Sequence, residues 1–306
     1  MKKVLCIAFA LAGYLATNAQ NIIDADDNRN PNDFYQKGIV VGKKAIPYPA
    51  VRESDVIWET VIWREIDFNE KFNQFFYFPT SDKSAQGRIS LIRLLVRNIM
   101  TGEIPIYNDD DMKEPMSPEQ AEKMLAGPGT DRKVVKTDAE GNELEDDEGE
   151  LIYETQHFDG EFDTNSVTKI RLKEVWYIDK QDTRQKVRIV GLQFQFITPP
   201  ITDPETGQEL TKGGPDWSFC IPMDDMRVRQ VLVNANAYDD NHDVVERSYD
   251  DIFIQRYFDS YIIRESNVYN RPIAGKGGYL TGEDAIIESQ MIEDKIFDIE
   301  SDMWEY

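Results

Sequence analysis

Two neighbouring runs of alternating residues constrain the fold of this chain more than any other feature. The first run, 170–179, has four apolar side chains at alternate positions: Ile170, Leu172, Trp176 and Ile178. The second, 185–197, is marked by five large apolar residues: Val187, Ile189, Leu192, Phe194 and Phe196. Side chains two positions apart lie on one face of a strand. The runs therefore predict a β-hairpin, and Gly191 allows a bulge or close packing in its second strand.

Several segments instead carry helix signals. Ser54 can cap a helix that begins at Asp55, and the apolar residues of 56–66 would then surround most of that helix. A second helix is expected over roughly 86–100, with Gly102 at its end. Capping patterns predict further helices at three places: Ser117–Gln120, Ser248–Asp251 and Thr281–Asp284. Helices and strands mix without regular alternation, which predicts an α+β fold of mixed helices packed on a mainly antiparallel sheet.

Composition excludes several classes of function. The chain has 306 residues, 34 of them basic and 57 acidic, which gives a net charge of −23. Such a surface repels phosphate backbones and anionic lipid headgroups, so we expect neither nucleic-acid binding nor electrostatic membrane attachment. Aromatic residues make up 11% of the chain, enough to build a core without a metal or disulfide.

The N-terminus has the pattern of an export signal. Two lysines precede an apolar stretch from Val4 to Leu15, and small residues lead to a cleavage site after Ala19. The stretch is too short for a permanent membrane span, and no later segment is apolar enough for one. Cys6 lies too early to be a lipoprotein cysteine. After cleavage only Cys220 remains, and we expect it to be a buried, inert thiol.

Three regions follow the signal peptide of residues 1–19. Residues 20–50 have no helical or alternating period but carry apolar side chains, which predicts an extended N-terminal arm that docks on another surface. Residues 51–306 are expected to form a single α+β domain. It is interrupted at about 130–163 by an acidic, mobile insertion, since residues 138–163 contain 12 acidic residues and no Lys or Arg.

No motif in the sequence carries chemistry. The mature chain has two histidines, His157 and His242, far apart and without a nucleophile signature nearby. Residues 138–149 fail as a calcium loop, because Glu143 stands where glycine is needed and Gly149 where a bidentate glutamate is needed. We therefore assign no catalytic, metal-binding or cofactor-binding residue. The alternative is an exported carboxylate-dependent hydrolase or a glycan-binding protein, since dispersed carboxylates can meet across a cleft.

The chain resembles the GldN (PorN) family. The most specific stretch is Asp-Val-x-Trp-x-x-x-x-Trp-Arg, which begins at Asp55. The resemblance is carried by seven runs in the same order: 53–67 (ESDVIWETVIWREID), 70–73 (EKFN), 77–79 (YFP), 174–179 (EVWYID), 188–192 (RIVGL), 250–253 (DDIF) and 264–273 (RESNVYNRPI). It implies a non-enzymatic periplasmic component of the type IX secretion and gliding machinery of Bacteroidetes. The implied partners are the outer-membrane lipoprotein GldK (PorK), with which it forms a ring, and GldM (PorM) of the GldL–GldM motor.

The residues themselves favour subunit contacts as well. An exported chain without a lipid anchor needs a partner to attach to the outer membrane, and a ring requires contacts between unlike surfaces. We predict that five residues contribute to subunit or partner interfaces: Ile39, Val41, Tyr48, Trp63 and Arg64. For Trp63, a place in the core is an equally good interpretation; for the arm, the alternative is disorder.

Overall fold

The computed structural model describes residues 43–80, 88–126, 130–135, 153–158, 162–198, 201–202, 209–211, 214–238, 247–269, 271–274 and 277–302. The chain divides into two compact units, Met1–Lys43 and Lys44–Tyr306. Except for Lys43, the described residues belong to the second unit. The expected signal peptide, arm residues 20–42 and the centre of the acidic insertion lie outside them.

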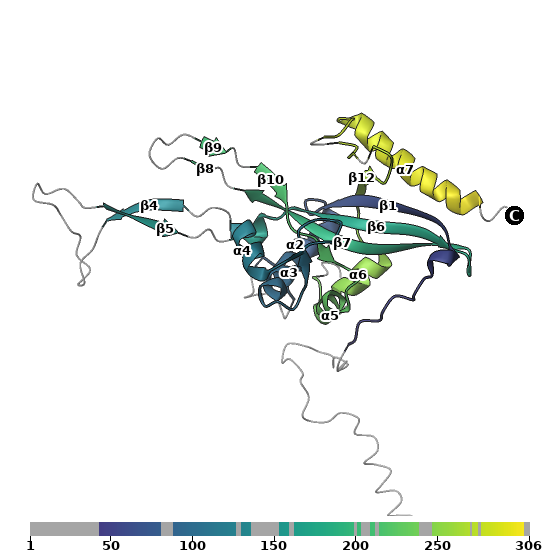
Figure 1. Ribbon diagram of the computed structural model, residues 1–306, viewed down its shortest axis with the longest axis horizontal. Helices are drawn as coiled ribbons and strands as arrows, with labels where there is room; N and C mark the ends of the chain where they lie inside the picture. Colours follow the sequence, from purple (N-terminus) through teal and green to yellow (C-terminus); the bar gives the residue numbers. More distant parts are fainter. Residues whose placement is uncertain are drawn as a thin grey trace, which may run out of the picture. The chain divides into compact units, whose positions relative to one another are not determined.

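A curled antiparallel sheet of six strands forms the centre of this unit (Figure 1). The strand order is β10–β7–β6–β1–β12, and β11 also pairs with β7. The strands are β1 (Val56–Asp67), β6 (Lys169–Asp179), β7 (Arg184–Thr198), β10 (Gly214–Trp217), β11 (Ile221–Pro222) and β12 (Tyr261–Glu265). The predicted hairpin is confirmed as β6–β7: Ile170 lies opposite Phe194 and Leu172 opposite Leu192, with a register shift next to Gly191.

The helix predicted to begin at Asp55 is wrong. A short 3-10 turn, η2 (Glu53–Asp55), leads directly into the twelve-residue strand β1. The strand pairs with β6 along almost its whole length and with β12 over Ile62–Glu65. Ile62 and Trp63, which point to opposite faces, are only 0% and 7% exposed. A strand that is covered on both faces has a continuous run of apolar residues instead of an alternation. Periodicity alone does not distinguish such a run from a buried helix.

Five helices surround the main core. They are α2 (Gln74–Tyr77), α3 (Leu91–Met100), α4 (Pro118–Ala126), α5 (Met226–Asn234) and α6 (Tyr249–Gln255). They enclose the sheet face that carries Ile66, Ile170 and Leu172, all fully buried. The expected helix ends are confirmed: Gly102 takes a left-handed φ of 76° just after α3, and Ser248 forms a capping box with Asp251 at the start of α6.

A sixth helix, α7 (Glu283–Asp302), packs along β12 (Figure 1). Its buried residues belong to a second apolar cluster: Ile62, Ile262, Ile273, Ile292 and Ile296. The backbone N–H of Ile262 donates to the Ser289 hydroxyl at 2.9 Å, so the helix also satisfies the outer edge of β12. Helices packed on an antiparallel sheet confirm the predicted α+β fold.

Smaller elements lie outside the main sheet. They are the hairpins β2 (Ile106–Tyr107) with β3 (Pro115–Met116), β4 (Thr130–Val135) with β5 (Tyr153–Phe158) and β8 (Ile201–Thr202) with β9 (Glu209–Thr211), and the turns η3 (Lys71–Asn73) and η5 (Thr164–Ser166). The ends of the acidic insertion thus form two antiparallel strands of six residues each. Across the described part of the chain, no helix has the length and apolar content needed to span a bilayer.

Candidate interaction surface

The last residues of the expected arm lie against the body of the unit. Ala45 is 8% exposed, and its backbone N–H donates to the Gln230 side chain at 3.1 Å. The Ile46 carbonyl accepts a hydrogen bond from Arg229, and the Pro49 carbonyl accepts one from Arg188. These contacts hold residues 45–50, which have no regular secondary structure, on α5 and on β7.

Tyr48 is the central side chain of this docked segment. Its ring lies 4.4 Å from the guanidinium carbon of Arg229 and 5.3 Å from that of Arg188. Burial raises the pKa of Tyr48, against the charge of Arg229, which lowers it. Arg229 is itself fixed by two 3.0 Å bonds to Asp250. The structure therefore places Tyr48 in a contact within its own subunit, at the point where the arm meets the body.

A groove of about 640 Å³ opens beside the docked segment. Its floor is the sheet face opposite the main core, because Val175 and Tyr177 alternate with the core residues of β6. Ile57 stands in it with 60% of its surface exposed. The lining residues are Val51, Glu53, Val56, Ile57, Trp58, Glu59, Val175, Tyr177, Arg188, Val190 and Asp224. We call this feature the β1 groove.

Trp63 lies on the same sheet face, further along β1. Its indole N–H donates to Asp110 at 2.9 Å, and the Arg264 guanidinium stacks over its ring at 3.5 Å. Asp110 also accepts a 2.8 Å bond from Arg264 and so fixes both groups. Lys173 approaches the ring to 5.5 Å. At 7% exposure, Trp63 is enclosed by its own chain.

Arg64 points to the other face, into a buried charge cluster. Its Nε lies 3.3 Å from Glu174, and its terminal nitrogen bonds Glu293 of α7 at 3.0 Å. Glu174 is fully buried and also accepts bonds from Arg256 and Trp176. Arg64 thereby links β1 to α7. A role for Trp63 and Arg64 in subunit contacts stays a prediction, and Ile39 and Val41 lie outside the described residues.

Sequence reasoning missed a second stacked cation. The Arg171 guanidinium lies 3.8 Å from the centre of the Trp217 ring. Burial, with the nearby charge of Arg264, lowers its pKa. Among the described residues it makes no ion pair, and its Nε has no hydrogen-bond partner. In the sequence, basic and apolar residues alternate over 169–173. The apolar residues predict the core face of the strand, and the basic residues between them indicate a second face that carries cations.

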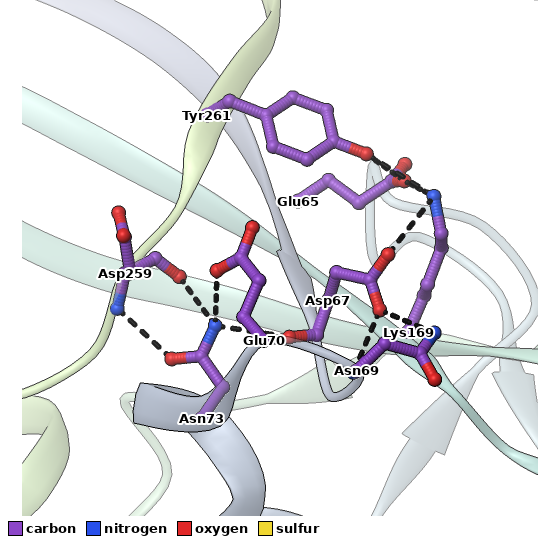
Figure 2. A network of polar contacts seen from close by, with 8 residues as sticks. All are labelled: Glu65, Asp67, Asn69, Glu70, Asn73, Lys169, Asp259 and Tyr261. Carbon is purple, nitrogen blue, oxygen red and sulfur yellow. Dashed lines mark hydrogen bonds and ion pairs between the residues drawn. The ribbon is translucent and has the colours of Figure 1, made fainter.

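A network of polar contacts surrounds the end of β1, and Figure 2 shows its residues. Lys169 bonds Glu65 at 2.7 Å and lies 3.8 Å from Asp67, while the Tyr261 hydroxyl donates to Glu65. Asn73 is fully buried; its amide group donates to Asp67, Glu70 and Asp259 and accepts from the backbone N–H of Asp259. This network joins β1, β6 and β12.

The chemistry of these groups suits structural support. In Figure 2 the Glu65 carboxylate is bonded to Lys169 and Tyr261, and those of Asp67 and Glu70 accept from amide groups, which does not favour a hydrolytic pair. Within the described ranges, no group of three His, Cys, Asp or Glu residues is arranged to hold a metal. Cys220 is 1% exposed, and burial raises the pKa of its thiol to about 12, as expected for an inert cysteine. The side chains of both histidines lie outside the described residues.

Comparison with known proteins identifies the family. No curated protein matches the chain. The family model described as "Gliding motility associated protein GldN" matches residues 51–305, which is most of the chain and nearly all of the unit Lys44–Tyr306. The chain therefore belongs to the GldN family of gliding-motility-associated proteins.

Proposed function

We propose that this protein is a non-enzymatic structural component of the type IX secretion and gliding machinery. In this proposal it forms a periplasmic ring with the outer-membrane lipoprotein GldK (PorK) and contacts GldM (PorM) of the motor. The observation that carries the proposal is the family match over residues 51–305, because a match of this extent covers the whole sheet and its helices.

Surface composition supports a role in assembly. Several large apolar side chains are well exposed, among them Val268 at 98%, Tyr269 at 75% and Phe297 at 67%. Large exposed apolar side chains are the groups that a contiguous partner surface would cover. The β1 groove adds a concave surface beside the docked segment 45–50.

The expected route of the chain fits a periplasmic location. Residues 1–19 have the pattern of a cleaved export signal. Attachment to the outer membrane would then depend on the lipoprotein partner.

Reconstitution tests this proposal. The mature chain 20–306 is mixed with the purified lipoprotein and followed by sedimentation velocity and negative-stain microscopy. We expect large annular particles that contain both proteins. Two proteins that sediment separately at micromolar concentration would refute the ring. A deletion strain that still exports type IX cargo would refute the role in secretion.

A further inference from the structure

We propose that the β1 groove receives residues 37–42 from the arm of a second copy of this chain. The inference rests on the proposed function, because it assigns one of the subunit contacts that a ring needs. In this contact an apolar stretch centred on Val40 lies beside Ile57 of the neighbouring subunit.

The chemistry of the groove suits an apolar segment with a basic flank. Val175 and Tyr177 form an apolar floor, and Ile57 is exposed at its side. Three exposed carboxylates line it, those of Glu53, Glu59 and Asp224, and none has an ion-pair partner among the described residues. Its one lining cation, Arg188, already bonds the Pro49 carbonyl and faces the rings of Tyr48 and Tyr177.

Residues 37–42 have the matching composition. They read Lys-Gly-Ile-Val-Val-Gly, so three β-branched residues stand between two glycines, with a lysine at one end. β-branched residues favour an extended backbone, and glycines at both sides let the chain enter and leave a narrow surface. The lysine would meet the unpaired carboxylates of the groove.

The sheet edge beside the groove is also open. β12 pairs with β1 only over Ile62–Glu65, so residues 56–60 of β1 have a neighbouring strand on one side only, within the part of the chain that is described. An extended segment can add to such an edge by main-chain hydrogen bonds while its side chains enter pockets.

The direction of the chain favours a second copy over the protein's own arm. Residues 45–50 are fixed to α5 and β7 by Ala45, Ile46 and Pro49, and only after them does the chain reach Val51 and Glu53 in the groove. Along the chain, a fixed segment therefore stands between residues 37–42 and the groove residues Val51 and Glu53. A contact of arm to groove joins two unlike surfaces and closes into a ring when the rotation allows it.

Disulfide trapping tests the contact directly. The variant Val40→Cys/Ile57→Cys is oxidised, alone and in complex with the lipoprotein, and separated on a non-reducing gel. Cys220, the other cysteine of the mature chain, is 1% exposed and so does not interfere. We expect a ladder of covalent oligomers, which neither single variant gives. A cross-link within one chain would overturn the second-copy assignment, and no cross-link in either preparation would overturn the groove contact.

A matched pair of substitutions provides a second measurement. Ile57→Arg places a cation in the groove, whereas Ile197→Arg makes the same change at a site of similar exposure, 60% against 64%, outside it. We expect Ile57→Arg to weaken self-association by at least about tenfold and Ile197→Arg by less than about twofold. Equal effects would overturn the proposal. Lipoprotein binding that survives without arm cross-links would leave the proposed function standing and remove only this contact.

Discussion

The buried charge cluster of β1, β6 and α6 offers the sharpest test of how this fold is held together. Glu174 is fully buried and accepts hydrogen bonds from Arg256 at 2.8 and 3.2 Å and from the Trp176 indole at 2.9 Å. It is also the carboxylate that faces the Nε of Arg64 at 3.3 Å. Glu174→Gln keeps the volume and one acceptor oxygen but removes the negative charge that the guanidinium groups of Arg64 and Arg256 share.

The magnitude follows from what each arginine retains. Breaking a buried ion pair by removing one partner costs about 3–5 kcal/mol, because a buried charge is left uncompensated. Arg64 keeps its bond to Glu293, and the Arg256 side chain is 25% exposed, so water screens part of its charge. Both facts place the expected loss near the lower limit, at about 3 kcal/mol in the free energy of unfolding.

Urea unfolding of the mature chain, followed by far-ultraviolet circular dichroism, measures this loss. The control is Glu59→Gln, which removes an exposed carboxylate on β1 that has no ion-pair partner among the described residues; we expect a change within about 0.5 kcal/mol. The m-value should stay the same in both variants. A loss below about 1 kcal/mol for Glu174→Gln would refute the reasoning, since the two arginines would then be satisfied without the carboxylate.

Three further predictions concern other contacts. Asn73→Ala removes the four hydrogen bonds of a fully buried amide and should lower the free energy of unfolding by about 3 kcal/mol in the same urea assay. Gly191→Ala would bring a new Cβ to 2.9 Å from the Cys220 sulfur, so we expect a loss of about 1–3 kcal/mol by thermal melting, partly restored when Cys220→Ala is added. Burial, and then the bond to Glu65, raise the pKa of Tyr261 to about 12. The stability that the protonated Tyr261 hydroxyl contributes is complete below about pH 10 and is lost as the pH rises through 12. The urea midpoints of Tyr261→Phe and of the unmodified chain should therefore converge over this range.

The sequence predicts the parts of this fold whose signals are local. In β6, apolar residues such as Ile170 and Leu172 alternate with charged residues such as Arg171 and Lys173, because one face meets the core and the other does not. The capping boxes at Ser117 and Ser248 are local in the same way, since each depends on a residue only three positions away.

The candidate surface depends on contacts that local patterns do not contain. Trp63 meets Asp110, which is 47 residues away, and Arg64 meets Glu293, which is 229 residues away. Such partners become visible only after the topology is known. The apolar residues of 20–50 predict a docking arm, whereas the three hydrogen bonds that fix residues 45–50 on α5 and β7 involve backbone groups and leave no pattern in the side chains.

β1 shows both local signals and long-range contacts, because the environment of this strand changes halfway along its length. Over Ile62–Glu65 it lies between two strands and is buried on both faces, which explains why its residue pattern resembles that of a buried helix. Over residues 56–60 it loses its neighbour on one side, and Ile57 stands exposed beside a bulge. Soluble proteins usually protect such an edge with charges, bulges or a covering segment. Here Glu59 supplies a charge, and the register shift between Val56 and Trp58 supplies a bulge. Among the described residues, no strand of the protein pairs with this edge. The same apolar run continues from the buried half of β1 into its open half. We therefore expect a partner in the assembly to cover the open edge at residues 56–60, as β12 covers Ile62–Glu65.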